Sequence, residues 1–117
     1  KLEDQRRREV RDALADRLSG MTARTLRAYL KADDPELRRA AALACAMKED
    51  QGHVPDLLPL LADEEPLVVR AAHAALKSLT GKDFGPRPGA GPNERMLAQV
   101  AWQGWWMRQQ HEAAARR

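Results

Sequence analysis

The sequence predicts an all-α fold, an α-solenoid in which antiparallel helix pairs stack into a right-handed superhelix of five or six helices. Apolar residues recur at helical spacing between helix start and stop signals along most of the chain. An apolar helix that opens at a proline occurs near residue 35 and again near residue 66, which indicates an internal repeat. Neither pair can bury its apolar face alone, so the pairs are expected to stack.

Length and composition limit the alternatives. The 117 residues suit a single domain over 1–117, and 44% hydrophobic with 32% charged residues is typical of a soluble helical protein. Twenty basic residues against 17 acidic ones give a net charge of only +3, which offers little non-specific attraction to nucleic acid. No apolar run approaches the ~20 residues that span a bilayer, so no membrane partner is expected.

The sequence does not determine the cellular compartment of the protein. Cys45 is the single cysteine, so it excludes an intrachain disulfide without fixing the redox environment. The first residues are too polar for a signal peptide, but a chain that begins with Lys1 is compatible with a signal segment removed earlier. Both a cytoplasmic and an exported protein fit these observations.

The first elements are an N-terminal capping helix over 1–20 and a first repeat over 22–49. The capping helix has no internal proline or glycine and a narrow apolar stripe of Val10, Ala13, Leu14 and Leu18. In the first repeat, Thr22 is expected to cap a helix that runs to about Ala32, and Asp34-Pro35 opens a second one. The residues expected to point inward from this second helix are Leu37, Ala40, Ala41, Ala44 and Met47.

A second repeat is expected over 53–81. Its first helix is short, and Pro59 within it is tolerated only near the helix start or at a kink. Its second helix is expected to be capped by Asp63 and ended by a left-handed Gly81. Its predicted inward face consists of Val69, Ala72, His73, Leu76 and Leu79.

A loop rich in proline and glycine follows over 82–92, with Phe84 as its apolar anchor, and a C-terminal capping helix capped by Asn93 is expected over 93–114. Trp102, Trp105 and Trp106 lie on one side of this helix and suit either a binding platform or closure of the open end of the stack. We favour closure, because burying a large apolar side chain contributes roughly 1.5–3 kcal/mol. Trp106, at the edge, is expected to stay partly exposed and is a weak candidate for partner binding.

The two repeats suggest an insertion. Leu37-Arg38-x-Ala40 recurs as Val69-Arg70-x-Ala72 after 32 residues, whereas the opening prolines at 35 and 66 are 31 apart. The match therefore predicts one extra residue in the second repeat.

These motifs resemble bacterial HEAT-like repeat proteins of the short-repeat kind, which include bilin lyases. The resemblance covers Thr22 to about Gln109, with Leu79-Thr-Gly-Lys-Asp-Phe-Gly-Pro86 and Trp102-x-x-Trp105-Trp106 similar to a C-terminal closing segment of such proteins. It implies a scaffold for protein partners in which Arg38 and Arg70 tie adjacent repeats through an aspartate. The inserted residue before Val69 departs from the family pattern at the second tie. A few members are bilin lyases or DNA glycosylases, and none of their catalytic signatures is visible in this chain.

Candidate sites are few. Arg6, Arg7, Arg8 and Arg11 alternate with acids, which favours a solvated helix face over phosphate contacts. On the concave side, where second helices lie, Arg39 and Lys77 are the better partner-binding candidates, with Arg38 and Arg70 better explained as ties between repeats. His53, His73 and His111 share no ligand spacing, so neither a metal nor another cofactor is expected, and His73 and Cys45 suit packing roles.

The function that the sequence favours is a non-catalytic module that binds another, unidentified protein through the second-helix face. Nucleic-acid binding through the basic concave residues and a role as an accessory domain or fragment of a larger enzyme or repeat protein are the alternatives. The oligomeric state is left open.

Overall fold

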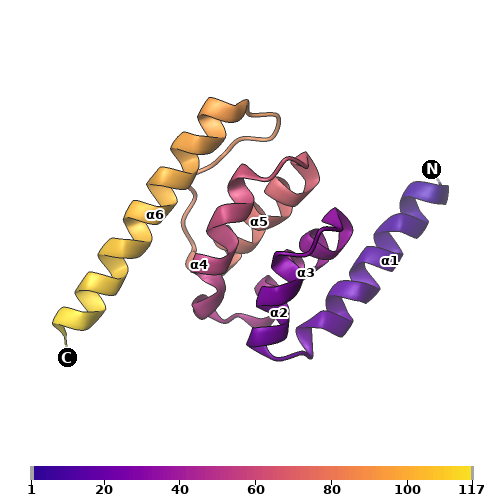
Figure 1. Ribbon diagram of the computed structural model, residues 1–117, viewed down its shortest axis with the longest axis horizontal. Coiled ribbons are helices and arrows are strands. Elements are labelled where there is room, and N and C mark those ends of the chain that lie inside the picture. Colours follow the sequence, from indigo (N-terminus) through magenta and orange to yellow (C-terminus); the bar gives the residue numbers. More distant parts are fainter. Residues whose placement is uncertain (1, 117) are drawn as a thin grey trace.

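A computed structural model describes residues 2–116, and every regular element within that range is helical (Figure 1). The elements are α1 (Leu2–Ser19), α2 (Ala23–Leu30), α3 (Pro35–Lys48), the 3₁₀ turn η1 (Gln51–His53), α4 (Val54–Leu57), the 3₁₀ turn η2 (Leu58–Ala62), α5 (Pro66–Thr80) and α6 (Pro92–Ala115). The predicted all-α solenoid is confirmed.

The helices form two layers. One layer holds α1, α3 and α5, because α3 contacts both of its neighbours, and the other holds α2, α4 with η2, and α6. Within each pair, α2 packs on α3, and α4 with η2 packs on α5. Two complete helix pairs are therefore flanked by two single helices, with α1 in the position of a preceding second helix and α6 in that of a following first helix.

Local signals explain most helix boundaries. Thr22 Oγ1 accepts the Thr25 backbone N–H at 3.2 Å and so caps α2, and Asp34 Oδ1 accepts that of Glu36 at 2.9 Å at the start of α3. Gly81 ends α5 with a φ of 72°, in the left-handed region that glycine adopts without a steric penalty. These three signals were predicted from the sequence.

Two predicted caps are wrong. Glu65 occupies the cap position of α5, and Asp63 instead accepts the Glu65 backbone N–H at 3.0 Å, outside the helix. Gly91 precedes α6, so Asn93 already lies inside that helix. The reason is the same in both cases: Pro66 and Pro92 take the first helical position, because a proline has the required φ and lacks the N–H that would need a cap there.

The short first helix of the second pair is split as Pro59 suggested. The chain is α-helical over Val54–Leu57 and changes to 3₁₀ geometry over Leu58–Ala62. Pro59 has no N–H to donate to the carbonyl four residues earlier, so the α-helical ladder cannot continue through it. The apolar residues on both sides of the change remain buried, namely Val54, Leu57, Leu58, Leu60 and Leu61.

The two second helices have a spacing of 31 residues, and no residue is inserted. Pro35 and Pro66 each stand at the first turn of their helix. Because successive helical residues turn by about 100°, this register makes Arg70 the counterpart of Arg39 and not of Arg38. The predicted 32-residue match is therefore wrong.

Several predicted core positions are affected by this register. Met47, predicted to point inward, is 51% exposed. Its counterpart at a spacing of 31 is Ser78, which is also exposed, whereas the buried Leu79 would be its counterpart at the wrong spacing of 32. On α1, Val10 and Ala13 are exposed, and Ala15 and Leu18 are the buried residues, because α3 is the main neighbour that covers this helix. The buried core is centred on Leu26, Leu57, Leu61, Leu76 and Trp102. The buried alanines of α3 and α5 complete it, namely Ala40, Ala41, Ala42, Ala44, Ala71, Ala72 and Ala75.

Candidate functional site

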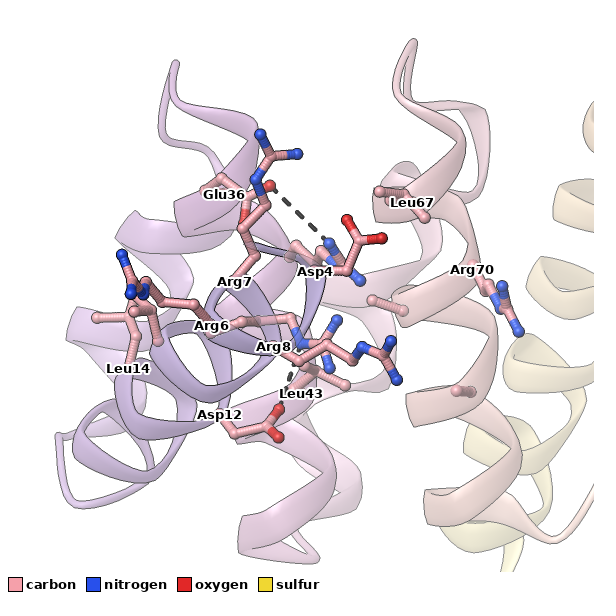
Figure 2. Close-up of a pocket in the computed structure, with 15 residues that line it drawn as sticks. Asp4, Arg6, Arg7, Arg8, Asp12, Leu14, Glu36, Leu43, Leu67 and Arg70 are labelled. Atoms are coloured by element: carbon pink, nitrogen blue, oxygen red, sulfur yellow. Dashed lines mark hydrogen bonds and ion pairs between the residues drawn. The ribbon is translucent and has the colours of Figure 1, made fainter. Parts of the chain in front are cut away.

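An open groove of about 1100 Å³ runs along the layer formed by α1, α3 and α5 (Figure 2). Its apolar lining comes from all three helices: Val10 and Leu14 from α1, Leu43 from α3, and Leu67, Ala71 and Ala74 from α5. The lining residues of α3 and α5 occupy equivalent positions at the repeat spacing of 31. The equivalent pairs are Glu36 and Leu67, Arg39 and Arg70, and Leu43 and Ala74. The groove is thus a product of the repeat.

Arginines dominate the polar lining. Six arginines border the groove against three carboxylates, and the charged residues are Asp4, Arg6, Arg7, Arg8, Arg11, Asp12, Glu36, Arg39 and Arg70. This excess of positive charge equals the net charge of the whole chain, +3. Figure 2 shows the arginines of α1 beside Glu36 and Leu43 of α3, while Arg70 stands on α5 with its guanidinium pointing away from α1.

The pairing of these arginines is incomplete. Arg11 Nε lies 3.3 Å from Asp12 Oδ1, and Arg39 Nη1 lies 3.9 Å from Glu36 Oε1. Among residues 2–116, no ion pair involves Arg6, Arg7, Arg8 or Arg70. Burial lowers the pKa of Arg39, and the positive charges of Arg11 and Arg70 lower it further. Like charges therefore repel one another around an apolar surface, so an anionic group placed there would be attracted.

Arg38, one of the predicted partner-binding residues, is absent from the groove. Its Nε and Nη2 donate to the two carboxylate oxygens of Asp63 at 2.8 and 3.0 Å, and its Nη1 donates to the carbonyls of Ala32 and Asp33. The hydrogen bond to Asp63 raises the pKa of Arg38. This contact joins the first repeat to the second, as the family resemblance implied for Arg38. Arg70 makes no such contact, because the register places it on the groove.

Two other predicted residues also lie outside the groove. Lys77 is exposed on α5 and is not part of the lining. Trp106 is partly buried and borders a separate cavity of about 460 Å³, together with Gln51, Thr80 and residues near the end of α6. Of the predicted partner-binding residues, Arg39 and Arg70 are the two that the structure brings to the groove.

Arg6, Arg7 and Arg8 of α1 are exposed, as expected of a solvated helix face, and together with the partly buried Arg11 they also line the open groove. Arg7, Arg11, Leu14 and Leu18 are spaced by four, three and four residues, so they share one side of the helix. Leu18 is buried and Leu14 packs against the core, so the arginines in the same row lie next to α3. This row was the signal in the sequence that could have placed Arg7 and Arg11 beside the groove.

The tryptophans close the second layer. Trp102 is fully buried, and its Nε1 donates to the Gly85 carbonyl at 2.8 Å. Its ring meets that of Phe84 edge to face, with centroids 4.9 Å apart, and Trp105 lies 6.2 Å from both rings. The indoles therefore pack α6 onto the preceding loop, which favours the predicted closing role over an exposed binding platform.

His53, His73 and Cys45 occupy packing positions, whereas His111 is exposed on α6. His73 Nε2 lies 2.7 Å from Asp83 Oδ1, as expected for a hydrogen-bonded packing histidine, and this bond lowers the pKa of Asp83. His53 is fully buried, with its Nδ1 3.7 Å from Asp56 Oδ2. Burial raises the pKa of Cys45 to about 12, so its thiol has little nucleophilic character at neutral pH.

Between residues 2 and 116, the structure holds no group of three or more histidine, cysteine, aspartate or glutamate side chains arranged for a metal ion. Within the same range, no helix combines the length and the apolar composition that crossing a membrane requires.

Comparison with known families agrees with the architecture. The family model of HEAT repeats matches residues 23–87, which run from α2 through α5 into the loop that follows. The match covers more than half of the chain and includes both helix pairs. No solved structure matches the chain.

Proposed function

Since the chain belongs to the family of HEAT repeat proteins, we propose that it is a non-catalytic interaction module that binds another protein in the groove between α1, α3 and α5. Repeat proteins of this kind use the extended surface formed by successive repeats for binding. The observation that supports the proposal most directly is that six arginines and six apolar side chains line the same groove.

The chemistry of the groove supports a partner that is both acidic and apolar. Arginine binds carboxylates through two parallel hydrogen bonds and is enriched at protein interfaces, where apolar contacts supply most of the affinity. A segment that combines carboxylates with apolar side chains satisfies both halves of the lining. Arg39 lies on α3, the middle helix of the three, and Arg70 lies on α5 at the far edge, so we assign the central contact to Arg39 and an edge contact to Arg70. Arg38, Lys77 and Trp106 have no part in this assignment.

The finer family assignment belongs to the same proposal. We infer that the chain is a short-repeat protein of the bacterial kind, one domain that α6 closes at its C-terminal end. The contacts of Trp102 with Phe84 and Gly85 support a closing role for this segment.

Nucleic acid is the alternative ligand for the same arginines, since they could bind phosphates. The groove lining contains no aromatic side chain on which a base could stack, and its apolar part comes from leucine, valine and alanine. This composition favours a protein partner.

The test uses a short synthetic amphipathic helix with glutamate beside leucine, measured by fluorescence anisotropy against the whole chain. The Arg39→Glu/Arg70→Glu variant is expected to weaken binding by about tenfold or more, because two attractive contacts become repulsive. The matched control, Arg17→Glu/Arg24→Glu, makes the same change of net charge at exposed arginines outside the groove and is expected to retain binding.

Equal losses in the two double variants would show that only overall charge attracts the peptide and would contradict a site in the groove. A labelled nucleic acid of random sequence provides the second arm. Binding of nucleic acid that is lost with Arg39 and Arg70, without any binding of the acidic helix, would replace the proposal with its alternative.

A further inference from the structure

The second cavity, of about 460 Å³, lies beside the C-terminal half of α6. Its walls come from three parts of the chain: Gln51 of η1, Thr80 and Lys82 around the end of α5, and α6 from Trp105 onward. Among residues 2–116, no residue lines both this cavity and the arginine-lined groove. Ligand sites in proteins typically have volumes of about 300–1000 Å³, so the cavity is large enough for a small ligand of its own.

Two indoles, Trp105 and Trp106, form the aromatic part of this cavity. Trp105 packs against Phe84 and Trp102, whereas Trp106 contacts the aromatic cluster through Trp105, and both rings stay partly exposed. Closure of the stack accounts for the buried Trp102 and leaves the exposure of Trp106 unexplained. The centroids of Trp105 and Trp106 are 6.3 Å apart and their planes are inclined by 44°. A flat nucleobase can therefore lie parallel to one ring at a time, whereas a ligand with a bent apolar surface can contact both.

The polar part of the lining is rich in amides. Three glutamines contribute to it, namely Gln51, Gln109 and Gln110. Two basic residues against one acid give the lining a net charge of only +1. A glutamine side chain both donates and accepts hydrogen bonds, so the cavity suits a neutral ligand that does the same.

The hydrogen bond of Gln51 favours a ligand with hydroxyl groups. Its Nε2 donates to the Leu79 carbonyl at 3.1 Å, which fixes the orientation of the amide and leaves Oε1 to accept. The carboxylate of Glu112, on the same cavity, also only accepts. A polyproline segment has carbonyl acceptors but no N–H donors, so it would cover these oxygens without pairing them. A hydroxyl group donates to such oxygens and accepts from the amide N–H groups of the other glutamines.

We propose that this cavity binds a short neutral saccharide between the two indoles and the glutamine amides. The C–H groups on the face of a sugar ring carry a small positive charge and the face of an indole is negative, so the two attract each other. The hydroxyls at the edge of the same ring pair with Gln51 and Gln110. Two linked, puckered sugar rings provide the bent surface that the inclined planes of Trp105 and Trp106 require. The hydroxyls exchange water for protein partners at little net gain, so binding is in the millimolar range.

The first experiment titrates the whole chain with cellotriose, maltotriose and triacetylchitotriose, followed by tryptophan fluorescence and calorimetry. At least one of these sugars is expected to change the emission, since Trp105 and Trp106 line the site. Trp106→Ala is expected to weaken the binding by about tenfold or more, and Trp106→Phe to retain part of it because an aromatic face remains. Absence of binding by all three sugars, or binding that Trp106→Ala leaves unchanged, would overturn the proposal.

The second experiment compares two exposed glutamines of α6. Gln110→Ala removes an amide from the cavity and is expected to weaken saccharide binding by about threefold or more. Gln103→Ala is the matched control, since Gln103 is exposed on the same helix outside the cavity, and it is expected to bind like the wild type. Equal affinities of the two variants would reject the amide contacts, and circular dichroism of each variant checks that the helices are intact.

Two further probes separate this site from its alternatives. Binding of decaproline or of adenosine that depends on Trp106, without binding of any of the three sugars, would replace the saccharide with that ligand. The Arg39→Glu/Arg70→Glu variant is expected to bind the saccharide like the wild type, because its substitutions lie in the groove. A loss in this variant would contradict a site separate from the groove.

Discussion

The two ends of the helix stack differ in how their outer helices meet water. At one end, α1 buries only Ala15 and Leu18, and the exposed residues from 2 to 10 include three arginines and three acids. At the other end, α6 buries Ala98 and Trp102, partly buries two more indoles, and leaves four large apolar side chains exposed. A repeat stack can end in water at a polar outer face but not at an apolar one. The comparison shows that α6 is held by a larger buried surface than α1 and also leaves more apolar surface exposed, with four large apolar side chains against Leu2 and Val10 on α1.

The largest expected effect comes from the anchor of the α6 end. Trp102→Ala should lower the free energy of unfolding by about 4 kcal/mol, because it opens a cavity and leaves the Gly85 carbonyl without its donor. Leu18→Ala, the equivalent change at the buried part of α1, should cost about 3 kcal/mol. Urea denaturation followed by circular dichroism measures both.

A smaller loss for Trp102→Ala than for Leu18→Ala would mean that the α6 end does not depend on its indole, and the contrast between the ends would fail. Trp102→Phe sharpens the result, since it keeps most of the apolar volume and removes the hydrogen bond. It should cost about 1–2 kcal/mol.

The next effect concerns the contact that joins the two halves of the stack. Arg38→Ala leaves the carboxylate of Asp63 without its partner, and the side chain of Asp63 is only 8% exposed. We expect a loss of about 3 kcal/mol in thermal or urea unfolding, since an uncompensated buried charge is costly. Arg39 follows Arg38 in the sequence but lies in the groove, where its one ion pair is a 3.9 Å contact with Glu36. Arg39→Ala should therefore cost less than about 1 kcal/mol. Similar losses for the two would show that the two halves are not joined through Arg38.

The smallest effect is a pH dependence at the loop beneath α6. The hydrogen bonds from His73 and from the Gly85 backbone N–H lower the pKa of Asp83 in the folded state. A lowered folded pKa stabilises the protein above the unfolded value, near 3.9, and this contribution disappears as the pH falls through the folded value. The melting temperature of Asp83→Asn should therefore be lower than that of the wild type at pH 6, and the difference should shrink at acid pH as Asp83 of the folded wild type becomes protonated. A difference that does not change with pH would assign the effect to packing.

The sequence was sufficient for the fold because its signals are local. Thr22, Asp34 and Gly81 each act within one turn of helix, and Pro59 breaks the helix that contains it, so these boundaries follow from neighbouring residues alone. The predicted Asp63 and Asn93 caps failed because two signals compete at those sites and the adjacent proline takes the first turn.

The groove was harder to predict because it depends on helix phase and on distant neighbours. A shift of one residue rotates a side chain by about 100°, so matching Arg38 with Arg70 assigned Arg70 to the wrong side of its helix. Whether a charged row on α1 meets solvent or a neighbouring helix depends on α3, which follows it only after another helix. Neither the phase of α5 relative to α3 nor the neighbour of α1 can be predicted from the sequence of one helix alone.

Because Cys45 is buried, the reactivity of its thiol reports how often the helix stack opens. The thiol lies on α3, the one helix that contacts both α1 and α5, and it has no exposed surface. A thiol reagent can therefore react only when the middle of the stack opens, and the labelling rate at excess reagent measures how often that happens. The chain has a single cysteine, so mass spectrometry of the labelled protein gives one labelling rate for each variant. These rates compare how strongly substitutions at the two ends of the stack increase its opening, with no added probe.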